Sequence, residues 1–340
     1  MYNKVVGGFM IEGNYKNKLV RSYILENEYL KVEVMNLGAT LVSFIDKQHD
    51  CDMVLGFENM ETYLTQHGSY LGASVGRCAN RIAKGCFKLN GVEYHLPINN
   101  GPNSLHGGID NFAFQVFETK VCDNVVEFSY HSKDGEEGYP GNLDLKITYE
   151  IVDKSLFYKI EGLSDQDTIL NITNHSYFNL SNGTDNVLEH ELKVYADKVA
   201  MVDENGLTKD EVIDVEGTDF DFRTFNKVSK AINSSHPNII LARGLDHNFV
   251  FENLDEKIVA ELAYKDCHLS VMSDLPGMHI YTANYLDGEV KGKKGRYYKE
   301  RDGICFECQY YPNAINYENY LKPILYKNQK MQHFIKYTIA

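Results

Sequence analysis

The sequence predicts an all-β protein, built as a large antiparallel β-sandwich with a few short helices. Three observations lead to this fold class: apolar and polar residues alternate with a period of two along much of the chain, turns rich in Gly, Asn and Pro separate these stretches, and helical periodicity is scarce. A period of two places successive side chains on opposite faces of a strand, so each stretch can bury one face. Many short strands between turns are typical of a sandwich.

The alternation begins at residues 30–34, where apolar residues occupy one face and charged residues the other. Residues 87–89 and 92–96 alternate on either side of Asn90-Gly91, a strong signal for a two-residue hairpin because both positions tolerate a positive φ. Further strands are expected at 143–150, 155–162, 168–174, 268–273, 279–285 and 303–310, and short helices near 58–66 and 226–234.

Nothing in the sequence marks a domain boundary. The chain has no low-complexity tract or Pro-rich linker, and only 7 of its residues are Pro. Because large all-β folds often exceed the usual domain size, we expect residues 1–340 to form a single domain. The longest irregular stretches are 97–113 and 131–142. Loops on a rigid sheet are where functional sites usually lie.

Composition excludes several classes of partner. With 34 basic and 48 acidic residues the net charge is −14, which argues against nucleic acid or an anionic membrane as a partner. No apolar run approaches the ~20 residues that span a bilayer, and the first thirty residues lack a signal-peptide core. The 7 scattered cysteines fit reduced thiols better than a disulfide framework. We therefore expect a cytoplasmic enzyme or binding protein.

Common cofactor and metal motifs are missing from the sequence. It has no GxGxxG, HExxH or GxSxG, and no short spacing of His and carboxylates that would hold a metal, so neither a cofactor nor a metal is expected. Cys305 and Cys308 form a CxxC, but their flanks predict a strand, which would put the two thiols on opposite faces. Two core cysteines are a better interpretation than a redox pair or a zinc site.

Between these cysteines lies Glu307, for which two interpretations stay open. A carboxylate among Ile304, Cys305 and Phe306 is expensive to bury unless it is partnered, so it could face water on an edge strand. Alternatively, Glu307 lies in a pocket and acts as a general base. The sequence of this strand does not decide between them.

Several other polar residues lie in segments rich in polar or turn-forming residues. His175 lies in a segment crowded with small polar groups, His106 follows a turn-rich segment, Asp246 precedes His247 in GLDHNF, and Asn80-Arg81 includes one of only seven arginines. Each of these residues alone is more often structural. Together they form a set of donors and acceptors suited to the hydroxyls of a neutral sugar.

Seven segments, in order along nearly the whole chain, resemble the aldose 1-epimerase, or galactose mutarotase, family. They are GRCANRIAKG (76–85), NNGPNSLHGG (99–108), DGEEGYPGNL (134–143), NITNHSYFNLS (171–181), GLDHNF (244–249), PGMHIYTANYLDG (276–288) and GICFECQYYPNAIN (303–316).

The resemblance implies a galactose mutarotase-like supersandwich that interconverts the α and β anomers of free aldohexoses such as D-galactose and D-glucose, without cofactor or metal. It implies that Glu307 is the general base for the anomeric hydroxyl and that His175 is the acid for the ring oxygen. It also implies that four residues bind the sugar: Asn80, Arg81, His106 and Asp246.

The sequence departs from the family pattern in places. His279 stands where the family commonly has Gln, and Cys308 replaces a more usual Thr, so the preferred sugar stays open. Because the chain has no Trp, an aromatic ring beneath the sugar must be Phe or Tyr, and Tyr177, Phe178 and Phe249 adjoin the motif residues. Further substrate contacts are expected at Tyr177, Phe249, His279 and Gln309.

Two alternatives of other kinds remain. A non-catalytic sugar-binding protein on the same fold would be expected to lose Glu307 or His175, and both are present. A relative that epimerises hexose 6-phosphates would need added positive charge, which the net charge of −14 weighs against. The expected partner is a neutral aldose, and the expected assembly is a monomer or a homodimer.

Overall fold

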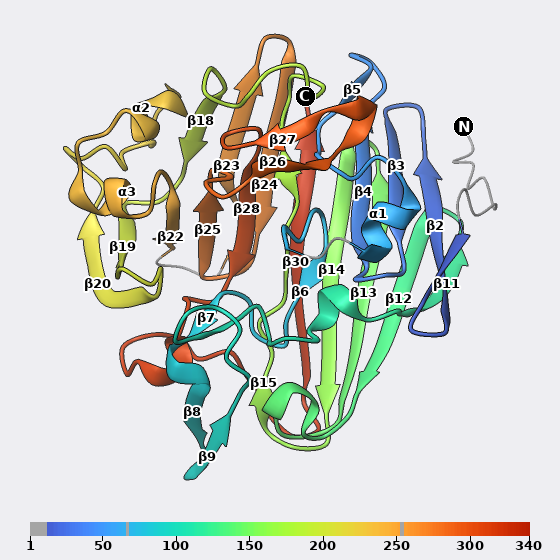
Figure 1. The fold of residues 1–340 in the computed structure, drawn as a ribbon, viewed down its shortest axis with the longest axis vertical. Helices are drawn as coiled ribbons and strands as arrows, with labels where there is room; N and C mark the ends of the chain where they lie inside the picture. The colour runs from blue at the N-terminus through green and yellow to red at the C-terminus, as the bar shows by residue number, and fades with distance from the viewer. Residues whose placement is uncertain (1–11, 66–67, 252–254) are drawn as a thin grey trace.

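Two broad layers of antiparallel β-sheet make up most of the fold (Figure 1). The computed structural model describes residues 12–65, 68–251 and 255–340. One layer is a nine-stranded sheet, which consists in spatial order of β11 (Glu118–Cys122), β12 (Val125–Ser132), β13 (Leu143–Val152), β14 (Ser155–Ser164), β30 (Lys330–Ile339), β24 (Cys267–Ser273), β23 (Lys257–Tyr264), β18 (Glu191–Val194) and β21 (Asn226–Lys227).

The other layer joins two sheets through a bridge between Val54 and Phe178. Its six-stranded part runs β17 (Tyr177–Phe178), β28 (Ile304–Gln309), β25 (Gly277–Tyr281), β22 (Asp246–Val250), β19 (Lys198–Val202) and β20 (Thr208–Asp214). Its five-stranded part runs β1 (Glu12–Tyr15), β2 (Lys18–Glu26), β3 (Leu30–Met35), β4 (Thr40–Asp46) and β5 (Cys51–Asp52).

Short elements cover the edges and ends of these sheets. The paired strands are β6 (Ser74–Val75) with β16 (Thr173–Asn174), β7 (Arg81–Ile82) with β10 (Ser104–Leu105), β8 (Cys86–Leu89) with β9 (Val92–His95), β15 (Thr168–Ile169) with β29 (Ile324–Leu325), and β26 (Asp287–Lys291) with β27 (Tyr297–Lys299). The α-helices are α1 (Met60–Thr65), α2 (Ser229–Ile232) and α3 (Pro237–Leu241). The 3₁₀ turns are η1 (Ala83–Gly85), η2 (Phe112–Phe114), η3 (Glu136–Gly138), η4 (Lys293–Gly295) and η5 (Ala314–Asn316).

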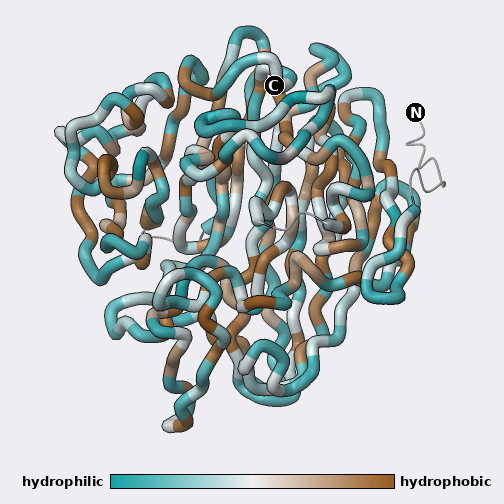
Figure 2. Tube along the Cα trace, viewed as in Figure 1, coloured by the Kyte–Doolittle hydropathy of each residue, from teal (hydrophilic) through white to brown (hydrophobic). Residues whose placement is uncertain are grey.

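The main hydrophobic core lies between the two layers. It draws Phe44 from β4, Phe128 from β12, Tyr158 from β14, Phe306 from β28 and Tyr337 from β30, all fully buried. In Figure 2 hydrophobic and hydrophilic residues alternate along the central strands, whereas the outer loops are mostly hydrophilic. This is the pattern expected where each strand buries one face. Among the described residues, no helix has the length and apolar character needed to cross a membrane.

The all-β fold class is confirmed, and so is the Asn90-Gly91 hairpin, whose two residues have φ values of 52° and 79°. The stretch 168–174 is not one strand: it forms the separate pairs β15 and β16. The strand predicted at 279–285 begins earlier and ends at Tyr281, because the turn that follows places Ala283 at φ 51°. The prediction of a single domain stays a prediction.

The predicted helices are shorter in the structure than in the sequence analysis. Helix α1 begins at Met60 rather than near 58, and residue 66, the last one predicted for it, lies outside the described residues. The stretch 226–234 divides into β21 and the four-residue helix α2. Helix α3 was missed, although Pro237 in its first turn is an ordinary start signal. Its cap is His236, an unusual residue at this position, which accepts a hydrogen bond from the backbone N–H of Asn238.

Replacing Phe306, a core aromatic residue of β28, tests the packing between the two layers. We expect Phe306→Ala to lower the free energy of unfolding by about 3–5 kcal/mol, because it removes a ring that is 0% exposed and leaves a cavity. Phe225→Ala is the matched control: its ring is 42% exposed, and we expect a change below about 1 kcal/mol. Urea denaturation measures both. Equal losses in the two variants would contradict the burial assigned here.

Candidate active site

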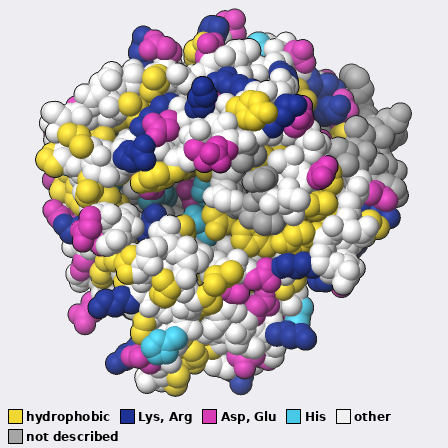
Figure 3. All heavy atoms as spheres, viewed as in Figure 1, with side chains coloured by type: hydrophobic (Ala, Val, Ile, Leu, Met, Phe, Trp, Pro, Cys, Tyr) yellow, Lys and Arg dark blue, Asp and Glu magenta, His cyan; other side chains and the backbone are white. Residues whose placement is uncertain are grey.

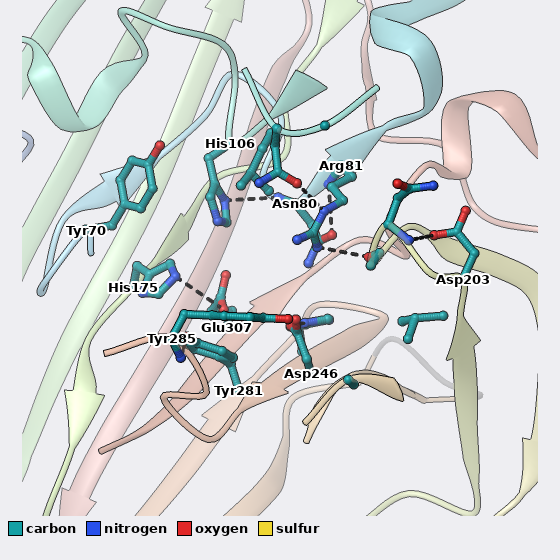
Figure 4. A pocket seen from close by; sticks show the side chains of 18 of the residues that line it. Tyr70, Asn80, Arg81, His106, His175, Asp203, Asp246, Tyr281, Tyr285 and Glu307 are labelled. Carbon is teal, nitrogen blue, oxygen red and sulfur yellow. Dashed lines mark hydrogen bonds and ion pairs between the residues drawn. The ribbon is translucent and has the colours of Figure 1, made fainter. Parts of the chain in front are cut away.

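A cavity of about 450 Å³ opens on the outer face of the six-stranded sheet. Figure 3 shows it as a hollow with histidine and acidic atoms at its floor, and Figure 4 shows side chains converging on it from strands and loops. Its walls include eight residues named in the sequence analysis: Asn80, Arg81, His106, His175, Tyr177, Asp246, His279 and Glu307.

Glu307 projects into this cavity from the middle of β28. The strand is hydrogen-bonded to β17 on one side and to β25 on the other, so it is not an edge strand, and Glu307 is only 2% exposed. Alternation turns Phe306 and Cys308 into the main core and leaves Cys305 and Glu307 on the other face. The solvent-facing interpretation of Glu307 is therefore wrong.

His175 lies beside Glu307 in the cavity, with its Nε2 3.7 Å from Oε1 of Glu307 (Figure 4). Its backbone is held at both ends: its N–H donates to the carbonyl of Ala73 at 2.8 Å, and its carbonyl accepts from Gly72 at 3.0 Å. The preceding Asn174 forms an Asx turn, in which its side-chain oxygen accepts from the N–H and the hydroxyl of Ser176.

Three buried Asn residues in this part of the chain match the sequence pattern of an N-glycosylation site. Asn171, Asn174 and Asn179 are each followed two residues later by Ser or Thr, yet all three are at most 2% exposed. The amide of Asn179 donates to the carbonyls of Asp185 and Asp302 instead. Oδ1 of Asn171 accepts from the backbone N–H of Tyr310 at 2.9 Å. All three sequons are therefore buried structural positions.

Asn80 and His106 approach each other because the strand after one pairs with the strand before the other. β7 and β10 are antiparallel, and at their ends Asn80 and His106 take left-handed conformations with φ 61° and 53°. The backbone N–H of Asn80 donates to Nδ1 of His106 at 3.2 Å, and the N–H of His106 donates to the Asn80 carbonyl at 3.0 Å. An acceptor role for Nδ1 places the proton of the neutral ring on Nε2.

Arg81 is anchored by a loop from a distant part of the chain. Its Nε donates to Oδ1 of Asn100 and its Nη1 to the carbonyl of Gly206, both at 2.9 Å. Gly206 has φ 71°, a conformation that favours glycine, and a Cβ there would lie 2.9 Å from the guanidinium carbon and displace the Arg81 side chain. The turn between β19 and β20 thereby holds Arg81 at the cavity wall.

Asp246 and His279 form a buried pair on neighbouring strands. Nε2 of His279 lies 2.6 Å from Oδ1 of Asp246, and the two residues are 1% and 9% exposed. Burial would raise the pKa of Asp246, but the hydrogen bond and charge of His279, together with Arg81, lower it overall. Asp246 is therefore a carboxylate at neutral pH.

Burial shifts the pKa values of the two facing groups in opposite directions. It raises the pKa of Glu307 to about 8, and the negative charge of Asp246 adds to the rise while Arg81 opposes it. Burial lowers the pKa of His175 to about 4. Near neutral pH the free pair thus holds one proton, which the carboxyl and the imidazole can share.

Tyrosine supplies the aromatic lining. Tyr70, Tyr177, Tyr281 and Tyr285 line the cavity, and the ring centroid of His175 lies 5.1 Å from that of Tyr177 and 5.8 Å from that of Tyr70. Apolar ring faces beside polar groups are suited to the mixed surface of a sugar.

Two expected substrate contacts lie elsewhere. Phe249 is fully buried in the main core, because three residues along β22 from Asp246 it points to the opposite face. Phe178 is buried in that core for the same reason relative to Tyr177. Gln309 shares the face of Glu307 but is 0% exposed and does not line the cavity.

Donor atoms come close enough for a metal in two places within the described residues. These are the groups His106, His175 and Glu307, and Cys86, Glu93 and His95, each with one atom per residue within 4.8 Å of the others. In the first group, the hydrogen bond from Asn80 keeps the proton of His106 on its other nitrogen, where a metal would need a bare lone pair. In the second, His95 and Glu93 are exposed and already pair at 3.2 Å. We assign neither group as metal ligands.

A model of the aldose 1-epimerase family matches residues 21–338. The chain belongs to the aldose 1-epimerase family. Galactose mutarotase of Sus scrofa is 40% identical over 321 residues, which covers 92% of each chain. Aldose 1-epimerase of Haemophilus influenzae is 37% identical and covers 86% of this chain and 87% of its own.

The structures agree with the sequences. The crystal structure of galactose 1-epimerase from Lactobacillus acidophilus superimposes with a TM-score of 0.89 at 30% identity, covering 99% of both chains. The family resemblance expected from the seven segments is therefore confirmed, together with the fold that it implied.

Sequence reasoning missed part of the cavity wall. Tyr281 could have been found, because it lies two residues after His279 on β25 and so faces the same way. Tyr70 and Asp203 come from turns and loops that carry no periodic signal, and only the folded chain brings them to the site. Tyr285 lies at the end of the stretch predicted as a strand at 279–285, but in the structure it follows the end of β25.

The two thiols of the CxxC lie on opposite faces of β28, as the alternation predicts. Cys305 packs against Tyr177 and Tyr281, whereas Cys308 is in the main core. Burial raises the pKa of Cys305 well above its usual range and that of Cys308 to about 12. A thiol that stays protonated is a poor nucleophile, which disfavours the redox hypothesis.

Thiol accessibility can be measured directly. We expect a disulfide reagent such as DTNB to react fastest with the exposed Cys122 of the native protein, and to reach Cys305 and Cys308 only after unfolding. Cys122→Ser should remove the fast phase. Peptide mapping that finds rapid labelling at Cys305 or Cys308 would contradict their burial.

Proposed function

We propose that the protein is an aldose 1-epimerase that interconverts the α and β anomers of free aldohexoses such as D-galactose and D-glucose. The observation that carries the proposal is the buried pair of Glu307 and His175, 3.7 Å apart at the floor of a cavity lined by hydrogen-bonding groups and tyrosines. Relatives that are 37–40% identical and named aldose 1-epimerase or galactose mutarotase support the same activity.

In the proposed reaction, Glu307 removes the proton of the anomeric hydroxyl while His175 gives a proton to the ring oxygen. The bond between the anomeric carbon and the ring oxygen breaks, and an open-chain aldehyde forms. Rotation about the bond between C1 and C2 presents the other carbonyl face. The ring then closes with the two proton transfers reversed, so both groups return to their starting states.

The geometry suits this chemistry because both reacting oxygens are bonded to the same carbon. Two groups 3.7 Å apart can reach both oxygens of a sugar held over them. The shifted pKa values keep one proton on the pair around neutral pH, which is the number that the reaction needs. The productive arrangement, with the carboxylate and the imidazolium, differs from the resting one only in where that proton lies.

The remaining residues are proposed to hold the sugar. Asn80 and His106 present donors from the loops, Arg81 presents one from β7, and Asp246 presents an acceptor from β22. Tyr177 and the other tyrosines would cover the apolar faces of the ring. His106 is the clearest donor, because its tautomer leaves a proton on Nε2.

The charges of the cavity weigh against a phosphorylated substrate. Of the described lining residues, only Arg81 is a lysine or arginine, whereas Asp203, Glu204, Asp246 and Glu307 carry carboxyl groups. Arg81 already donates two hydrogen bonds within the protein. A neutral aldose therefore fits better than a hexose 6-phosphate. We further propose a cytoplasmic location and a monomer or homodimer.

Polarimetry tests the function. We expect the protein to accelerate the mutarotation of fresh α-D-glucose, α-D-galactose and xylose, and to leave glucose 6-phosphate unaffected. Glu307→Gln should lower kcat by ~10²–10⁴-fold, because it removes the base while keeping the shape of the side chain. His175→Asn should have a similar effect through loss of the acid.

Glu118→Gln on the exposed edge strand β11 is the matched control and should keep full activity. Circular dichroism and sugar binding should be preserved in Glu307→Gln. No acceleration at stoichiometric protein would favour the alternative of a non-catalytic sugar-binding protein, and full activity of Glu307→Gln would overturn the base assignment.

The pH dependence follows from the same pair. Below about pH 4 His175 gains a proton and no base remains, and above about pH 8 Glu307 loses its proton and no acid remains. We therefore expect kcat/KM to be level between these values and to fall about tenfold per pH unit outside them. The uncatalysed rate must be subtracted at each pH. A catalysed rate that keeps rising beyond pH 9 would contradict this assignment.

A further inference from the structure

His279 lines the cavity, and its side chain is hydrogen-bonded to another lining residue, Asp246. Its Nε2 faces Oδ1 of Asp246 at 2.6 Å, a distance typical of charge-assisted hydrogen bonds. Its Nδ1 has no hydrogen-bond partner among the described residues. The side chain is 1% exposed, so the sugar can reach little of it. A residue that mainly binds substrate would instead expose its polar atoms to the cavity.

The sheet register places this pair directly beside the proposed base. His279 on β25 lies opposite Glu307 on β28 and opposite Asn248 on β22, and all three side chains share the outer face. Asp246 lies two residues from Asn248 on the same strand, so it is a diagonal neighbour of His279. The carboxylates of Asp246 and Glu307 thus lie on either side of the His279 ring (Figure 4 labels both).

We propose that His279 is a positioning residue, which holds the carboxylate of Asp246 in place and offsets its negative charge beside Glu307. Without that offset, two buried carboxylates would face the same small cavity, and the second would ionise with difficulty. This proposal rests on the function proposed above in one respect: the charge balance affects catalysis only if Glu307 is the base. The balance itself can be measured in the free protein.

Several other ionisable groups act on this part of the site, and one of them, Arg81, also lowers the pKa of Asp246. Asp246 raises and Arg81 lowers the pKa of Glu307, while the charge of His279 lowers the pKa values of His106 and His175. The titratable or charged groups around Glu307 and His279 are Arg81, His106, His175, Tyr177, Asp246, His247, Tyr281 and Cys305.

Charge-altering variants separate this role from a packing role. His279→Gln keeps a donor for Asp246 but cannot carry a positive charge, so we expect the titration of Glu307 to move up by about one pH unit. Asp246→Asn removes the negative charge and should move it down by a similar amount. The double variant replaces an ion pair by a neutral pair, so its titration should return close to that of the wild type.

The measurement is the carboxyl ¹³C shift of Glu307 in protein labelled at glutamate, assigned by the signal missing in Glu307→Gln. The kcat/KM profile should move in the same direction in each active variant. His279→Leu, which also removes the donor, should in addition raise KM, because Asp246 loses its anchor. His279→Gln should restore KM toward the wild-type value relative to His279→Leu.

The outcomes are distinct. A KM change in His279→Gln without a shift in the Glu307 titration would make His279 a simple substrate contact and overturn the proposal. A double variant whose Glu307 titration stays as far from that of the wild type as in either single variant would also overturn it. Shifts that follow the predicted signs in a protein that does not accelerate mutarotation would support the charge balance and refute the proposed function instead.

Discussion

The arrangement of the site depends on burying one carboxyl group in the middle of a sheet. Glu307 is 2% exposed on a strand with neighbours on both sides, and removal from water raises its pKa to about 8. An isolated carboxylate there would be very unfavourable. Both the charges and the hydrogen bonds of the surrounding residues therefore matter for Glu307; these residues are Arg81, Asp246, His175 and His279. As a result, Glu307 can release and regain a proton near neutral pH.

Geometry is supplied by rigid pairing rather than by a flexible loop. Three adjacent strands, β22, β25 and β28, align Asp246, His279 and Glu307 on one face. The loop residues Asn80 and His106 are held by hydrogen bonds to each other in left-handed turns. Backbone conformations of this kind persist only where the surroundings support them, and they cluster at functional sites.

Much of this could be predicted from the sequence, and one error could have been avoided. Alternation along β28 correctly separated Cys305 and Glu307 from Phe306 and Cys308. The same rule applied to β22 would have excluded Phe249, which lies three residues from Asp246 and faces the core. The motifs drew attention to these polar residues, and their roles as base, acid and sugar ligands are our proposal.

Period-two patterns and turn residues established the class of fold and the side chains that share a face, because both are local properties of a few consecutive residues. They could not show which strands are neighbours. The contacts of Arg81 with Gly206, of Asp246 with His279 and of His175 with Glu307 join residues 125, 33 and 132 positions apart along the chain. Such contacts form only when the sheets pack, and burial in that packing is what shifts the proton affinities of Glu307 and His175.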